Sequence, residues 1–150
     1  MANASARTVI NRPVSEVFAA IADITRMGEW SPECHAGRWV TPATGPALGA
    51  KFEGDNALAL GPVTLKRWTT TSEVTAFEPG HTFEFVTEGY TTWRYELTGD
   101  DTSTTVTESF SYPPHTPAKK FLYDTLGRRS TAMVSGMQRT LDGLKRALEA

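Results

Sequence analysis

The feature that most constrains the fold is a long region, residues 37–112, in which apolar and polar residues alternate with a period of two. Thr, Val and aromatic residues dominate this region, and Gly and Pro mark the turns that interrupt it. Strands that follow one another through short turns predict an antiparallel meander rather than parallel β-α-β units. Including one strand before this region, the predicted strands span residues 7–11, 37–41, 50–58, 63–74, 82–86, 90–97 and 104–112.

Helical periodicity flanks this region on both sides. Pro13 is placed to begin a first helix, because its fixed φ and missing N–H suit the first turn. Asp23 is suited to cap a second, short helix that ends near Gly28. A long amphipathic helix is predicted after the prolines of 113–117, with Gly127 either inside it or separating a short leading helix from it. Its apolar face comprises Leu122, Leu126, Met133, Met137, Leu141, Leu144 and Leu148.

The order of these elements predicts an α+β fold made of one domain over residues 1–150. Two short helices are expected between the first two strands. A seven-stranded antiparallel sheet must curl to avoid two long exposed edges, and the C-terminal helix is the natural cover for its concave side. A curved sheet around one helix need not fill the space between them, so we expect a pocket of roughly 300–1,000 Å³ there.

Composition argues against several classes of protein. The formal net charge is -2 and the densest basic stretches are only pairs, so the chain lacks the basic surface of an electrostatic nucleic-acid binder. No apolar run approaches the roughly 18 residues that span a bilayer, and the first residues lack the apolar core of a secretory signal. Cys34 is the only cysteine, so no intrachain disulfide can form. We therefore expect a cytoplasmic protein without stable membrane insertion, and its oligomeric state stays open.

The motifs give no support to metal or nucleotide chemistry. Cys34 and His35 are adjacent on an extended segment, so their side chains point to opposite faces and cannot form a catalytic pair or half of a metal site. His81 and His115 are isolated, and no spacing resembles a zinc motif, a P-loop or a dinucleotide fingerprint. We expect neither a metal nor a cofactor.

Glu108 is the most informative single residue for function. It shares one face of the last predicted strand with Phe110 and Tyr112, and that face is otherwise apolar. A carboxylate turned into an apolar cavity must be paired with a cation, accept hydrogen bonds or have a raised pKa. Glu108 is therefore a candidate anchor for a ligand hydroxyl or amine, or a candidate general acid or base. The alternative is a structural glutamate at the cavity mouth, or one held by Arg67, Asn56 or a buried water.

Strand parity also predicts an aromatic shell around the pocket, interrupted by Asn56, Thr70, Ser72 and Glu108. Along residues 63–74 the inward positions change from odd to even, which predicts a β-bulge near Arg67. Each aromatic can equally be a packed core residue, and the two methionines of the long helix can either adapt to a ligand or fill core gaps. The candidate ligand-binding residues are Trp30, Phe52, Asn56, Trp68, Thr70, Phe83, Phe85, Trp93, Tyr95, Glu108, Phe110, Met133 and Met137.

Several segments carry a resemblance to a known family. They read VINRPVSEVFAAIADITRMGEWSPE, GAKFEGDN, RWTTTSEVTAFEPGHTFEF and WRYELTGDDTSTTVTESF, followed by the terminal GMQRTLDGLKRALEA. Over nearly the whole chain they resemble the START-like, or SRPBCC, superfamily, within its polyketide cyclase/dehydrase group. The resemblance implies a helix-grip fold. It implies no single activity, because members include lipid carriers, aromatase/cyclases, hormone receptors and chaperone co-activators.

Three functions are compatible with this pattern. The first is binding or transport of a hydrophobic small molecule, such as a lipid, a sterol-like compound or an aromatic polyketide, in an internal cavity. The second is a polyketide cyclase, aromatase or dehydratase that uses Glu108 as acid or base, with Tyr95 or Tyr112 as donors. The third is a protein-interaction module, which a large exposed apolar patch would favour. We expect the first, because parity alone places no second titratable group beside Glu108.

Overall fold

The computed structural model describes residues 2–60, 62–113 and 129–150, without the side chains of residues 2–3, 58–60 and 129–133. In chain order the elements are β1 (Ala2–Ile10), α1 (Val14–Ala22), the 3₁₀ helix η1 (Ile24–Glu29), β2 (Cys34–Trp39), β3 (Lys51–Leu60), β4 (Val63–Glu78), β5 (Thr82–Thr87), β6 (Thr91–Gly99), β7 (Thr104–Tyr112) and α3 (Arg129–Glu149).

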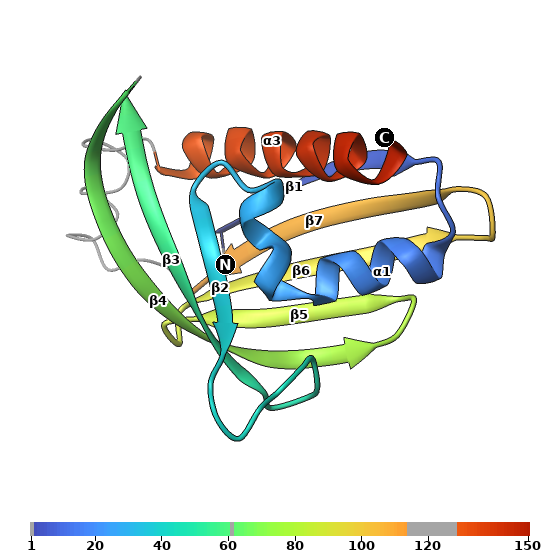
Figure 1. Ribbon diagram of the computed structural model, residues 1–150, viewed down its shortest axis with the longest axis horizontal. Coiled ribbons are helices and arrows are strands. Elements are labelled where there is room, and N and C mark those ends of the chain that lie inside the picture. Colours follow the sequence, from blue (N-terminus) through green and yellow to red (C-terminus); the bar gives the residue numbers. More distant parts are fainter. Residues whose placement is uncertain (1, 61, 114–128) are drawn as a thin grey trace.

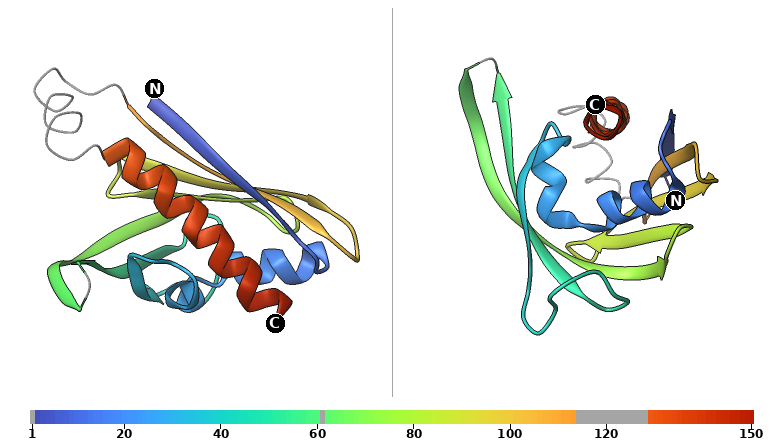
Figure 2. Two further views of the ribbon diagram at one scale, coloured as in Figure 1. Left: turned by 90° about the horizontal axis from the view of Figure 1, so that it is seen from above. Right: turned by 45° about the vertical axis from the view of Figure 1, so that its right-hand side comes forward.

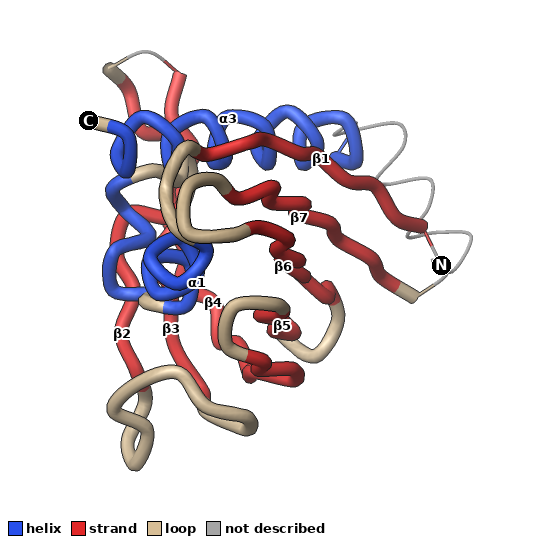
Figure 3. Tube along the Cα trace, turned by 90° about the vertical axis from the view of Figure 1, so that its right-hand side faces the viewer, coloured by secondary structure: helices blue, strands red, loops and turns tan. Residues whose placement is uncertain are grey.

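The strands form one seven-stranded sheet in the order β1-β7-β6-β5-β4-β3-β2, with every neighbouring pair antiparallel. The sheet is strongly bent, so that β3 and the first part of β4 form an arm that rises beside α3 (Figure 1). Seen nearly end-on, α3 lies inside this curve, between the β3–β4 arm and the β1–β7 edge (Figure 2). Figure 3 shows α3 running alongside β1. The predicted helix-grip fold is confirmed.

The predicted element order is correct, and the differences lie in the strand ends. β7 has its predicted limits, whereas β1 starts at Ala2 because it pairs with β7 as far as Tyr112. Its first residues alternate between alanine and polar residues, but alanine is too small to give a strong strand signal, so the pairing with β7 is what defines them as a strand. β2 starts at Cys34 rather than residue 37, and its register shifts between Cys34 and Ala36. The predictions for Leu122, Leu126 and Gly127 lie outside the described residues.

The two short helices form where local sequence signals place them. Pro13 immediately precedes α1, whose Val17, Phe18 and Ile21 are buried against the sheet and α3. The Asp23 carboxylate accepts hydrogen bonds from the Thr25 backbone N–H at 3.2 Å and from its hydroxyl at 2.5 Å. The predicted cap of the second helix is thus confirmed, and η1 ends at Glu29.

The packed core occupies one end of the space between sheet and helix. Leu141, Leu144 and Leu148, in the C-terminal half of α3, pack there with α1 and with inward residues of the sheet such as Leu97 and Val106. Earlier in α3, Met137 joins a smaller cluster with aromatic residues of β7, and Val134 packs against that cluster. The N-terminal half of the helix therefore covers a part of the sheet that the core does not fill.

Thr104 supports a first stability prediction. Its side chain is almost fully buried, and its hydroxyl donates to the backbone carbonyl of Arg12 at 2.9 Å, which ties β7 to the segment before α1. Thr104→Val keeps the shape and removes the donor, so the free energy of unfolding should fall by about 1–2 kcal/mol. Urea unfolding measures this loss. Thr107→Val on the opposite face of the same strand is the control and should change stability by less than about 0.5 kcal/mol; equal losses would refute the role of this bond.

Candidate functional site

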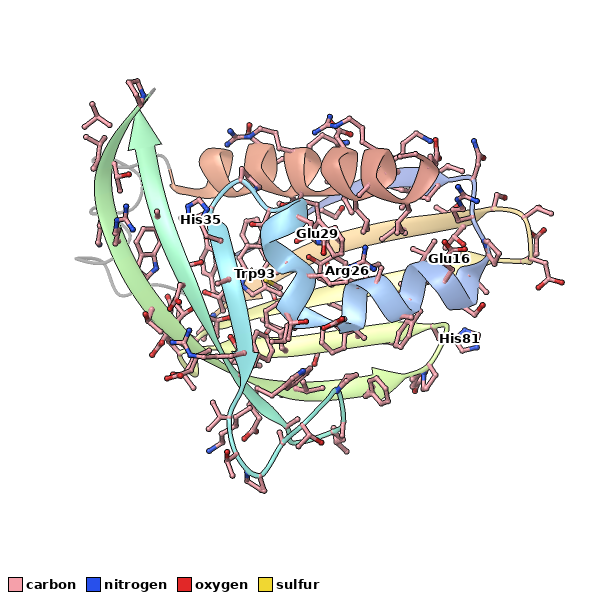
Figure 4. All side chains as sticks on the ribbon, viewed as in Figure 1. Glu16, Arg26, Glu29, His35, His81 and Trp93 are labelled. Carbon is pink, nitrogen blue, oxygen red and sulfur yellow. The ribbon has the colours of Figure 1, made fainter. Side chains whose placement is uncertain are left out.

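A cavity of about 390 Å³ lies between the concave face of the sheet and the N-terminal half of α3. This volume falls within the range that was expected for a small-molecule pocket. The sheet contributes most of the lining, including Trp93, which is labelled in Figure 4. The lining side chains from the sheet are those of Cys34, Phe52, Asn56, Ala57, Trp68, Thr70, Ser72, Phe85, Thr87, Thr91, Trp93, Tyr95, Glu108 and Tyr112.

Most of the residues predicted from the sequence meet at this cavity. The predicted candidates that line it are Phe52, Asn56, Trp68, Thr70, Phe85, Trp93, Tyr95, Glu108 and Met137. The alternation predicted for the strands holds, since inward residues of β7 are all buried and the residues between them are only partly buried. Strand parity therefore identified the correct face of the sheet.

Three candidates belong to the packed interior instead of the cavity lining. Phe83 is fully buried in the main core, and Trp30 is buried beneath α3, where its backbone and Cβ lie against Gly143. Phe110 packs between the rings of Trp93 and Tyr112, with centroid distances of 5.6 and 5.9 Å. Parity gives the face of a strand but not the position along it at which the core ends and the cavity begins. The side chain of Met133, the remaining candidate, lies outside the described residues.

The bulge predicted in β4 is present slightly earlier in the chain. Leu58 pairs with Lys66 but Ala59 pairs with Thr64, so the extra residue on β4 is Leu65, two residues before Arg67 and close to the predicted place. Beyond this point Trp68, Thr70, Ser72 and Val74 point toward the concave side, as expected from their even positions. A second register shift, between Val74 and Ala76, was not predicted because the strand was expected to end at Val74.

Sequence reasoning missed part of the lining. Thr87 continues the alternation of Phe83 and Phe85, so a longer predicted strand would have included it. Gly136, Arg139 and Thr140 line the cavity from α3, within one helical turn of Met137. Cys34 was considered for a catalytic pair, a metal site and a disulfide but not for the lining, yet it is buried in the wall, and burial raises the pKa of its thiol.

Glu108 and Tyr95 form the most unusual feature of the cavity. They are directly opposite each other on β7 and β6, and the Tyr95 hydroxyl donates to Oε2 of Glu108 at 2.9 Å. The side chain of Glu108 is buried, and its Oε1 has no hydrogen-bond partner in the part of the chain that the structure describes. The two suggested side-chain partners are not used: Arg67 is exposed, and Asn56 instead donates to Thr70 Oγ1 at 3.2 Å.

Burial determines the protonation state of this pair. It raises the pKa of Glu108 to about 8, and the hydrogen bond from Tyr95 lowers that pKa only in part. Burial and the neighbouring Glu108 carboxyl raise the pKa of Tyr95 well above its ordinary value. At neutral pH both groups are therefore predominantly protonated, and the cavity contains a neutral carboxylic acid rather than a carboxylate.

Other polar side chains of the cavity have hydrogen-bond partners within the protein. Asn56 also donates to the backbone carbonyl of Gly54 at 3.2 Å, and the hydroxyls of Ser72 and Thr87 are 2.8 Å apart. These groups can exchange partners with a ligand but do not need one. Among the described side chains, Oε1 of Glu108 is the buried polar atom that lacks a partner.

Two further observations concern metals and membranes. Over residues 2–60, 62–113 and 129–150, no group of three or more His, Cys, Asp or Glu side chains is arranged to hold a metal ion. Within the same ranges, no helix has both the length and the apolar character required to cross a membrane. Figure 4 shows His35 on β2 and His81 at the other end of the molecule, and the predicted isolation of His81 from His115 concerns a residue outside the described ranges.

Comparison with known proteins identifies relatives over the full length of this fold. The family described as polyketide cyclase/dehydrase and lipid transport matches residues 1–149. A polyketide-cyclase-like protein from Corynebacterium glutamicum is 31% identical, with a TM-score of 0.60, over 98% of this chain and 91% of its own. No match was found among curated proteins.

More distant solved structures share the fold. An AHSA1-like protein from Aeromonas hydrophila is 22% identical, with a TM-score of 0.64, over 99% of this chain and 92% of its own. A protein from Mycobacterium smegmatis is 17% identical, with a TM-score of 0.67, over 98% of this chain and 90% of its own. These likenesses concern the helix-grip architecture alone.

Proposed function

This chain belongs to the polyketide cyclase/dehydrase and lipid transport family, and we propose that it binds a hydrophobic small molecule in the cavity beneath α3. The observation that carries the proposal is the cavity of about 390 Å³, lined by aromatic side chains and a few polar ones. That volume suits a compact apolar molecule with a rigid body and one or two oxygens, such as an aromatic polyketide or a small sterol-like or lipid compound.

The driving force would be transfer of apolar ligand surface out of water. Burial contributes about 25 cal/mol per Å², so a ligand that buries ~300 Å² gains ~7.5 kcal/mol before the costs of association and ordering. Aromatic rings from Phe52, Phe85 and Trp93 supply the apolar surface, and Asn56 and Glu108 supply polar contacts that orient the ligand. The proposal therefore requires no cofactor.

Gly136 offers a direct test of the proposal. It lines the cavity from α3, and an added Cβ at this position would meet nothing within 4 Å. We expect Gly136→Leu to occupy the cavity and weaken binding of N-phenyl-1-naphthylamine, a neutral apolar fluorophore, by at least about tenfold. Helix stability should be unchanged or higher, because leucine favours a helix more than glycine does. Fluorescence titration measures the affinity.

Ser135→Leu is the matched control for this substitution. Ser135 is the preceding residue of α3 and is exposed, so its leucine adds the same apolar group to the outside of the helix. The control should bind the fluorophore as the unchanged protein does. Equal affinity of all three proteins would mean that the fluorophore does not enter this cavity, and the proposal would lose its main support.

A specific observation also favours a second candidate, an acid/base enzyme of the cyclase or dehydratase type. Tyr95 lies beside Glu108, so a second proton donor is present where the sequence pattern had not placed one. In that case Glu108→Gln would abolish turnover of a poly-β-ketone substrate while fluorophore binding persists. If the protein only binds its ligand, neither the unchanged protein nor Glu108→Gln forms a product.

A further inference from the structure

The unpartnered oxygen of Glu108 indicates what the cavity is built to hold. A buried polar atom without a partner costs free energy, so folded proteins rarely retain one unless it serves a ligand or a water. Oε1 is such an atom, and Glu108 is part of the cavity wall. On the opposite side of the same carboxyl group, Oε2 already accepts the Tyr95 hydroxyl at 2.9 Å.

The hydrogen bond from Tyr95 fixes the direction in which the carboxyl group can donate. Tyr95 has a single O–H, and it donates that hydrogen to Oε2. In the neutral acid the remaining proton then resides on Oε1, which has no acceptor among the described residues. Carboxylic acids held neutral in apolar sites are effective hydrogen-bond donors. The arrangement is a directed chain from Tyr95 through Glu108 into the cavity.

We propose that the cavity selects an uncharged ligand that carries a carbonyl oxygen, and that this oxygen accepts a hydrogen bond from Oε1 of Glu108. The inference rests on the proposed binding function and specifies the chemical class of its ligand. A carbonyl oxygen accepts a hydrogen bond and donates none. It therefore complements Glu108, whose Oε1 donates and whose Oε2 already accepts from Tyr95.

The surroundings of Glu108 disfavour a charged ligand. Its cross-strand neighbours are Tyr95 on β6 and Ala6 on β1, and Met137 of α3 lines the same cavity. The remaining charged or titratable side chains that face this space are those of Glu33, Cys34, Tyr90, Tyr112 and Arg139. Burial raises the pKa of Glu108 and the Tyr95 hydrogen bond lowers it, and no cationic side chain of the described residues, Arg139 included, adds to these two causes. A carboxylate ligand would therefore have to leave water beside a buried acid, and an ammonium ligand would require Glu108 to ionise at a site where burial favours its neutral form.

Fluorenone and fluorene provide the test, because they have the same tricyclic shape and differ by a carbonyl in place of a methylene group. Their affinities are measured by displacement of N-phenyl-1-naphthylamine from the intact protein, Glu108→Gln and Glu108→Leu. The reported quantity is the preference for fluorenone over fluorene. We expect Glu108→Leu to lower this preference about tenfold, whereas Glu108→Gln retains it because an amide N–H can donate in place of the acid.

A pH series separates this donor role from simple packing. The preference should fall in the unchanged protein as the pH rises through 8, since a carboxylate cannot donate, and should stay constant in Glu108→Gln. The same preference in all three proteins, without pH dependence, would overturn the inference while binding itself stands. If neither compound displaces the fluorophore from the unchanged protein, the proposed function fails and the inference fails with it.

Discussion

Glu108→Gln is expected to stabilise the protein by an amount that grows with pH, and the increase between pH 4 and pH 9 should reach about 5 kcal/mol. The reason is that burial raises the pKa of Glu108 from its ordinary 4.5 to about 8. Below pH 4.5 the carboxyl is protonated in both the folded and the unfolded chain, so it contributes no pH dependence. Between these pKa values the unfolded chain loses the proton and the folded chain retains it, so the stability of the unchanged protein falls as the pH rises.

Urea unfolding at pH values from 4 to 9 measures this effect as the difference between the two proteins. Asp55, Asp100 and Glu149 have lowered pKa values because of hydrogen bonds that favour their charged forms, and they are present in both proteins, so their contributions cancel. Glu73→Gln, at an exposed position on β4, is the control for the chemical change from glutamate to glutamine. Parallel curves for Glu108→Gln and the unchanged protein would show that Glu108 is not held neutral by the fold.

Gly28→Ala is expected to lower the free energy of unfolding by about 3 kcal/mol or more. An added Cβ at this position would lie 2.0 Å from the backbone carbonyl oxygen of His35, so η1 and β2 would have to move apart. Backbone atoms cannot yield as the end of a flexible side chain can. Thermal or urea unfolding measures the loss. Gly45→Ala is the control, because nothing lies within 4 Å of its added Cβ.

The same substitution also probes how the cavity wall is held. The segment between η1 and β2 supplies Ser31, Pro32 and Glu33 to the cavity lining. If η1 is displaced, these residues move with it, so fluorophore affinity should fall in Gly28→Ala even where the protein is folded. A variant with unchanged stability and unchanged affinity would contradict the close packing of η1 on β2.

The fold could be predicted because its signals are local. Alternation along the strands, Pro13 and Asp23 at the helix starts and the apolar face of α3 each depend on residues close in sequence. β1 shows the limit of such signals, since the apolar residues of its first part are alanines and its start is defined by pairing with β7. The depth of Phe83 and Phe110 in the core was equally hidden, because it depends on how α3 crosses the bent sheet.

The Tyr95–Glu108 pair could be predicted from the sequence in part. The predicted strands contained both residues on inward faces, and the short turn between β6 and β7 determines the register that makes them direct partners. Extending the hairpin pairing from Gly99 and Thr104 toward the strand ends would have placed Tyr95 opposite Glu108. What the sequence could not provide is that Oε1 would have no partner, since that depends on every element around the cavity.

The central claim is that the cavity holds a hydrophobic small molecule, and its most direct test is the content of the natively purified protein. The protein would be denatured in organic solvent and any released compound identified and quantified by mass spectrometry, with Gly136→Leu processed in parallel. We predict a stoichiometric apolar compound from the unchanged protein and its loss from Gly136→Leu. An empty protein that also gains no thermal stability from a panel of lipids, sterols and aromatic ketones would contradict the claim.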